Sequence, residues 1–201
     1  GVDLVARILS ATLVVALAAW ITRCLHWDGL ADVADGLGSG GAPEQARAVM
    51  RRSDIGPVGV LTLVFTVLVQ VLSLAQLPAG STALAAWVLA VMLGRLAVGV
   101  ACGPWFRPAR PDGLGALVIG SMSASRLLTA GLLSGGVAVV ATLAGPLPWS
   151  GSLLWGPVAA VGVALWLGRL ARRRFGGSTG DVLGGTAELA TTAVLLVLAL
   201  R

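Results

Sequence analysis

The sequence predicts an all-α integral membrane protein, a polytopic helical bundle with about six transmembrane helices. The chain is 57% hydrophobic and 11% charged, and its mean hydropathy of +0.92 lies outside the range of soluble domains. Its apolar runs approach the roughly 20 residues that a helix needs to cross a bilayer. Nearly all of the chain therefore lies in or at the membrane, so residues 1–201 are expected to form a single domain.

Hydropathy sets the expected spans. They are residues 4–25, 55–77, 82–102, 127–143, 153–170 and 182–200. Residues 113–126 are rich in Gly and Ser and end in an arginine, which fits a re-entrant segment, an interfacial segment or a broken span. The sequence leaves these three alternatives open.

The arginines indicate the orientation of the bundle. All fourteen basic residues are arginine, and connections 23–54, 107–112 and 172–181 hold most of the charges, whereas 77–81 and 145–152 hold none. The positive-inside rule places the charged connections on the cytoplasmic side. Nucleic-acid binding is not expected, because the arginines lie at helix ends instead of forming a stripe with interleaved aromatic residues.

Three aspartates follow the first apolar run. Asp28, Asp32 and Asp35 are spaced i, i+4, i+7, so a helix places their carboxylates on one face. The residues between them are apolar, which favours an amphipathic helix over a solvated acidic loop. Crowded carboxylates need a proton or a cation, and Mg²⁺ fits because it binds carboxylates together with substrate phosphates. The neighbouring His26 is a candidate general base, or a hydrogen-bond partner of an aspartate.

Two further segments carry polar residues that suit phosphate binding. Arg51, Arg52 and Ser53 precede the second span, where arginine could clamp phosphate or face lipid head groups. Near the last span, Thr179 and the backbone at Gly180 could donate to phosphate oxygens.

Two acids follow in that last segment. Asp181 and Glu188 share a helix face at i, i+7 and are candidate metal ligands. The alternative for Glu188 is a structural ion pair with Arg95 or Arg126.

Four stretches together resemble a known family. The stretches "HWDGLADVADGL", "MRRSDIGPVGV", "ARPDGLGAL" and "GGSTGDVLGGTAEL" are similar in order and spacing to those of bacterial cobalamin synthase, the adenosylcobinamide-GDP ribazoletransferase family. The resemblance covers nearly the whole chain. Family members usually carry a further N-terminal hydrophobic segment before the point where this sequence begins.

The resemblance implies a membrane enzyme, a transferase of cobalamin (vitamin B12) biosynthesis. A hydroxyl of α-ribazole, or of its 5′-phosphate, attacks the phosphate attached to cobinamide in adenosylcobinamide-GDP, and GMP leaves. The family requires Mg²⁺ and resides in the bacterial cytoplasmic membrane. Residues 1–201 then form a single membrane-embedded catalytic domain facing the cytoplasm, either as a homo-oligomer or in association with other cobalamin-assembly enzymes.

The family motifs also imply roles for individual residues. The aspartates of the first stretch correspond to the acidic motif, expected to act in catalysis and in metal binding, and the acids of the last stretch are expected to complete the metal site. Arg51, Ser53 and Arg110 fall in stretches expected to bind phosphate. The chain departs at Arg52 and Asp54, where many members have an acid followed by a base, so no family role transfers to either residue.

The residues argue against two other functions. A CDP-alcohol phosphotransferase needs an Ala-Arg pair after its first Asp-Gly, but Asp32 stands where that arginine belongs. A transporter would scatter charges through the depth of the bilayer on inverted repeats, but most charges here lie toward one face and no convincing repeat is found.

Overall fold

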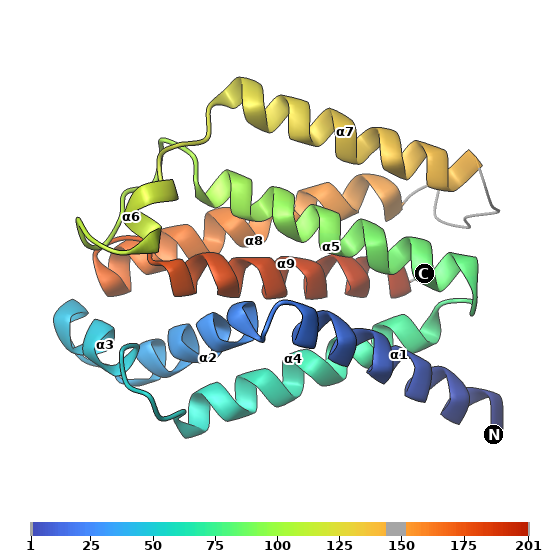
Figure 1. Cartoon of the computed structure of the whole chain (residues 1–201), viewed down its shortest axis with the longest axis horizontal. Helices are drawn as coiled ribbons and strands as arrows, with labels where there is room; N and C mark the ends of the chain where they lie inside the picture. The colour runs from blue at the N-terminus through green and yellow to red at the C-terminus, as the bar shows by residue number, and fades with distance from the viewer. Residues whose placement is uncertain (1, 144–151, 201) are drawn as a thin grey trace.

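The computed structural model describes residues 2–143 and 152–200, which form nine helices and no named strand (Figure 1). The helices are α1 (Val2–Ile21), α2 (Leu25–Gly38), α3 (Pro43–Val49), α4 (Pro57–Gln76), α5 (Ser81–Ala101), α6 (Leu114–Val118), α7 (Ala124–Leu143), α8 (Ser152–Phe175) and α9 (Gly180–Ala199). The predicted all-α membrane bundle is confirmed.

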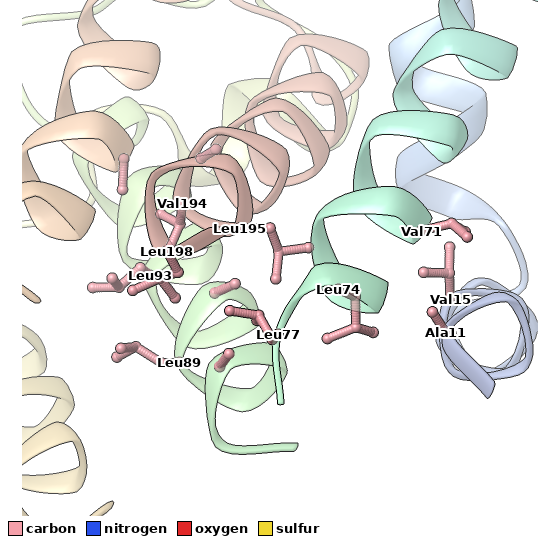
Figure 2. Packing of buried hydrophobic residues seen from close by; sticks show 14 of the residues in the cluster. Ala11, Val15, Val71, Leu74, Leu77, Leu89, Leu93, Val194, Leu195 and Leu198 are labelled. Carbon is pink, nitrogen blue, oxygen red and sulfur yellow. The ribbon is translucent and has the colours of Figure 1, made fainter. Parts of the chain in front are cut away.

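Helix α9 is the central element of the bundle. It packs against α2, α4, α5 and α8, and its side chains are buried along most of its length. Figure 2 shows Val194, Leu195 and Leu198 of α9 near Leu93 of α5 and Leu74 of α4, within the main apolar core. Helix α6 also touches α9, so the position of the first residues of α9 is set from several sides.

The first predicted span ends earlier than hydropathy suggested. Residues 4–25 were expected to form one apolar run, but α1 ends at Ile21, and Arg23 and Cys24 take left-handed backbone conformations with φ of 52° and 57°. The backbone N–H of Cys24 donates to the carbonyl of Ala19 at 2.8 Å, a hydrogen bond that closes a helix C-terminus. The chain turns there, and α2 starts in a new direction.

The expected number of about six spans is not confirmed. Within the described residues, four helices are long and apolar enough to cross a bilayer: Asp3–Ile21, Pro57–Gln76, Ser81–Ala101 and Gly180–Ala199. Helix α8 carries Arg169 and the arginines of residues 172–174 in its last two turns, which lowers its hydropathy. The uncharged connection predicted at 145–152 lies almost entirely outside the described residues.

The charged connections gather at one end of the bundle. Figure 1 shows α3, α6, the C-terminal ends of α2 and α8 and the start of α9 at that end, with both chain termini at the other. Residues 113–126 form the five-residue helix α6 and a turn into α7, too short to span a membrane. An isolated parallel bridge between Pro108 and Ser178 joins two of the charged connections beside α9.

Candidate active site at the junction of α2 and α9

Helices α2 and α9 approach each other closely through glycines. A Cβ atom on Gly29 of α2 would lie 2.8 Å from the backbone oxygen of Asp181, and one on Gly184 of α9 would lie 3.2 Å from the Cα of His26. Only glycine permits such a backbone approach. The acidic face of α2 therefore lies beside the first turn of α9.

The carboxylates of α2 and the Asp181 carboxylate of α9 are close enough for their negative charges to repel one another. Burial, and then the charges of Asp28, Asp181 and Asp35, together raise the pKa of Asp32 to about 7. Asp28 is exposed, and in the described part of the chain neither Asp28 nor Asp32 has an ion-pair or side-chain hydrogen-bond partner. The cluster therefore favours the uptake of a proton or a cation.

The N-terminus of α9 opens onto a small polar cavity. Thr179 caps the helix by accepting a hydrogen bond from the N–H of Val182 at 3.3 Å, and its hydroxyl donates to Asp181 Oδ2 at 3.2 Å. The cavity measures about 180 Å³ and is lined by Arg110, Asp112, Gly113, Gly115, Ala116 and residues 178–181. A helix N-terminus with an arginine beside it suits a phosphate group.

Residues 107–116 reach this cavity because they are bonded to the turn before α9. The N–H of Ala109 donates to the carbonyl of Ser178 at 2.8 Å, and the N–H of Ser178 donates to the carbonyl of Arg107 at 2.9 Å. A Cβ on Gly115 would lie 3.0 Å from the backbone nitrogen of Gly180. These contacts place Arg110 beside Asp181, although 71 positions separate them in the sequence.

Asp35 has a different environment from the other two aspartates of α2. Its Oδ2 accepts a hydrogen bond from the N–H of Gly56 at 2.7 Å, and its Oδ1 accepts one from the N–H of Gly59 at 2.8 Å. These donors belong to the start of α4, whose first N–H groups have no partner within the helix. Asp35 thus caps α4 from a separate helix.

His26 and Glu188 face each other inside the bundle, away from the α9 N-terminus. His26 Nδ1 lies 3.8 Å from Glu188 Oε1 and 3.4 Å from Arg95 Nη2. Because the guanidinium can only donate, Nδ1 accepts from it and the proton of the neutral ring sits on Nε2. Burial, and then the Arg95 charge, lower the pKa of His26. The ring therefore has no free lone pair with which to act as a base.

The residues before α4 that were predicted to bind phosphate lie on the protein surface, away from the cavity. Arg51, Arg52 and Ser53 are all exposed in the connection between α3 and α4, and none of them lines the cavity at α9. The neighbouring Arg47 instead donates to the carbonyl of Phe175 at the end of α8. That contact joins two helix ends.

The donor chemistry of the cluster fits Mg²⁺ in one arrangement. Among the residues described, no group of three or more His, Cys, Asp or Glu side chains is placed to hold one metal ion directly. Mg²⁺ usually binds through one or two carboxylates and completes its octahedron with water and substrate phosphates. Asp28, Asp32 and Asp181 supply such carboxylates beside a phosphate-sized cavity, whereas Asp35 and Glu188 are engaged elsewhere.

Comparison with known proteins shows the family to which the chain belongs. The family model described as cobalamin-5-phosphate synthase matches residues 1–199. The chain belongs to the cobalamin-5-phosphate synthase family. A relative from Frankia casuarinae named adenosylcobinamide-GDP ribazoletransferase is 42% identical, with 96% of this chain and 72% of the relative covered. Relatives of the same name from Corynebacterium efficiens and a Nocardioides species are 38% and 40% identical, covering 96% and 92% of this chain and 70% of each relative. No solved structure matches the chain.

The structure brings to the candidate site residues that the sequence did not indicate. Ser178, Asp112 and Gly115 line the cavity with Arg110. The glycine pair Gly29 and Gly184 allows the helix approach. Both glycines stand in the stretches that carry the family resemblance, and their position beside a carboxylate motif was the available signal.

Replacing Asp35 with alanine is expected to destabilise the metal-free protein by about 2 kcal/mol, because two backbone donors at the start of α4 lose a charged acceptor. The matched comparison is Asp32→Asn, which removes a charge from the crowded carboxylates and should raise the melting temperature in EDTA at pH 8. Thermal unfolding in detergent measures both. Equal shifts in the same direction would contradict the separate roles of the two aspartates.

Proposed function

We propose that this chain is an adenosylcobinamide-GDP ribazoletransferase. It joins adenosylcobinamide-GDP to α-ribazole, or to its 5′-phosphate, and forms adenosylcobalamin, or its 5′-phosphate, and GMP. Family membership over residues 1–199 and the names of the relatives support this reaction. The observation that carries it is the meeting of the α2 carboxylates with Asp181 and Arg110 at the N-terminus of α9.

The reaction exchanges one phosphorus–oxygen bond for another. The ribazole hydroxyl oxygen bonds to the phosphorus attached to cobinamide, the bond from that phosphorus to the bridging oxygen breaks, and GMP departs with that oxygen. The hydroxyl proton passes to a base. His26 is a poor acceptor because its Nδ1 faces Arg95, so a carboxylate of the cluster takes this role.

Residues around the cavity would position the diphosphate. The backbone N–H groups at the start of α9 and the Arg110 guanidinium donate to phosphate oxygens, and Thr179 keeps the helix start ordered. One or two of the carboxylates of Asp28, Asp32 and Asp181 would hold Mg²⁺, which when bound neutralises charge on the diphosphate and on departing GMP. Positioning and electrostatics then supply most of the rate enhancement.

The active end is assigned to the cytoplasmic side of a bacterial cytoplasmic membrane. The charged connections gather at that end of the bundle in Figure 1, as the positive-inside rule requires. Nucleotide substrates are made in the cytoplasm, which agrees with this orientation. A homo-oligomer, or association with other enzymes of cobalamin assembly, stays a prediction from the sequence.

The raised pKa of Asp32 predicts an unusual dependence of stability on pH. Between pH 4 and about 7 the folded protein keeps a proton on Asp32 that the unfolded chain has released, so stability falls as pH rises through this window. We expect the melting temperature in EDTA to fall by a few degrees between pH 5 and 8. Mg²⁺ should raise it more at pH 8 than at pH 5, and Asp32→Asn should flatten both effects. A melting temperature that rises over this range would contradict the crowding of these carboxylates.

The reaction is tested by measuring product with purified protein in lipid or detergent. Adenosylcobinamide-GDP and α-ribazole 5′-phosphate are supplied with Mg²⁺ or with EDTA, and GMP and cobalamin 5′-phosphate are quantified. We expect equal amounts of the two products, and only with Mg²⁺. Folded protein that forms no product from these substrates, but releases CMP with a CDP-alcohol, would overturn the proposed function.

A further inference from the structure

A polar network extends from the bundle interior to its surface, about two turns along α9 from the cavity. Gln70 Nε2 donates to Glu188 Oε2 at 3.3 Å and to Thr192 Oγ1 at 3.0 Å. His26 stands on the other side of Glu188, with Arg95 behind it. We call this set the interhelical network; its members are Gln70 of α4, Glu188 and Thr192 of α9, His26 of α2 and Arg95 of α5.

Burial makes this network costly to keep. Glu188 is 7% exposed and Gln70 is 0% exposed, in helices that meet the length and hydropathy of membrane spans. The Oε1 atom of Gln70 is buried without a hydrogen-bond partner in the described residues. The amide therefore directs its N–H group to Glu188 and leaves its own acceptor unpaired. A carboxylate inside a span signals a functional constraint.

The network does not touch the reacting groups. Glu188 follows Asp181 by seven residues, which is about 10 Å along a helix that rises 1.5 Å per residue. It does not line the cavity at the α9 N-terminus. Any influence of Glu188 on the reaction must therefore act through the helices that it joins.

The contact between α2 and α9 needs such a link. Gly29 and Gly184 let the two backbones touch, but a glycine offers no side chain that interlocks with the facing helix. In the described residues, His26 and Glu188 approach each other across this contact, and Arg95 supplies the attraction: its guanidinium donates to His26 Nδ1 and its positive charge attracts the Glu188 carboxylate. Gly184 also packs directly on the His26 backbone, so the polar contact lies about one turn beyond the glycine contact on α9.

We propose that the interhelical network fixes the register of α2 against α9 and so holds Asp28 and Asp32 opposite Asp181. Glu188 is its central positioning residue, because it contacts both α2 and α4. This inference rests on the proposed function only in naming the reaction that the register serves. A misplacement of 1 Å among catalytic groups lowers turnover by about 100-fold.

Kinetics of four variants test the positioning role. We expect Glu188→Ala to lower kcat by about 100-fold and Gln70→Leu by at least tenfold, with less than a twofold change in the Mg²⁺ concentration for half-maximal activity. Glu188→Gln keeps an acceptor for Gln70 and should stay within about fivefold of the parent. Thr191→Val is the matched control. Thr191 is buried on α9 one turn after Ala187, and its hydroxyl donates to the carbonyl oxygen of Ala187 at 2.8 Å. It is not a member of the interhelical network.

A distance measurement reports the register without catalysis. With Cys24 and Cys102 replaced by serine, spin labels on Ser39 at the end of α2 and Leu200 at the end of α9 report axial sliding by pulsed electron resonance. Glu188→Ala should shift or broaden the distance distribution by 1 Å or more, and Glu188→Gln and Thr191→Val should leave it unchanged.

The outcomes separate this inference from the proposed function. Failure of the parent protein to make GMP would reject the function, while the spin-label distances would still report the register. A several-fold rise in the Mg²⁺ requirement of both Glu188→Ala and Glu188→Gln, without an effect of Gln70→Leu, would make Glu188 a metal ligand and overturn the positioning role. Lost turnover with unchanged distances would overturn the control of register.

Discussion

Replacing Asp32 with asparagine is expected to lower kcat by about 1,000-fold and to raise the Mg²⁺ concentration needed for half-maximal GMP release. Asp32 lies at the centre of the acidic face, because Asp28, Asp35 and Asp181 all contribute to its raised pKa. The asparagine side chain has nearly the same shape, so the fold is preserved while a negative ligand is lost. The measurement is product formation over a range of Mg²⁺ concentrations.

The control for this substitution is Asp54→Asn. Asp54 is an exposed acid in the connection before α4 and does not contribute to the charge around Asp32. It should change neither kcat nor the Mg²⁺ requirement by more than about twofold, since an isolated surface charge is strongly screened. Normal turnover by Asp32→Asn with an unchanged Mg²⁺ dependence would remove Asp32 from the proposed metal site.

Stability measured on the same variant gives an independent readout. Relief of repulsion should raise the melting temperature of metal-free Asp32→Asn at pH 8, even as catalysis is lost. Gain of stability with loss of activity is the expected result for a charge kept for function. A variant that lost both would instead have a damaged fold.

Local periodicity was enough to predict the acidic face. The i, i+4, i+7 spacing placed Asp28, Asp32 and Asp35 on a helix, and α2 contains all three. The environments of the three aspartates differ because residues far along the chain pack against them. Asp35 accepts hydrogen bonds from the N–H groups of Gly56 and Gly59, and no pattern in the sequence of α2 predicts that contact.

A shared helix face did not predict that two residues belong to the same site, because it carries no information about their separation along the helix axis. Asp181 and Glu188 lie on one face of α9, but two turns separate them, and Glu188 meets Gln70 and His26 instead of the cavity. Arg95, which the sequence offered as one alternative partner for Glu188, reaches it by way of His26. Sequence spacing gives direction around a helix, whereas the partners depend on which helices pack alongside.

The connections were the least predictable part of the site. Only the family resemblance indicated Arg110, and its place in the cavity depends on the bridge between Pro108 and Ser178. Such a bridge forms between two irregular segments and has no periodic signal. In contrast, the clustering of charges in three connections correctly indicated that these segments meet at one end of the bundle (Figure 1).

Adding a single methyl group at Gly29 is expected to impair the site strongly, although less than replacing Asp32. The Cβ of alanine would lie 2.8 Å from the backbone oxygen of Asp181 and 2.9 Å from its Cα, so one helix must move. Both obstacles are backbone atoms and cannot rotate away as a flexible side chain would. We expect Gly29→Ala to cost about 1–3 kcal/mol of stability and about 100-fold in kcat.

Gly162→Ala on α8 is the matched control, because a Cβ there meets no atom within 4 Å. That substitution should leave turnover unchanged and stabilise the helix by about 0.5–1 kcal/mol, as alanine loses less backbone entropy than glycine. Thermal unfolding and GMP release on both variants separate steric displacement of α2 from a general effect of alanine. If Gly29→Ala retained full turnover, the carboxylates of α2 could act from a greater distance to Asp181. The shared metal site would then have to be replaced by one that α2 holds alone.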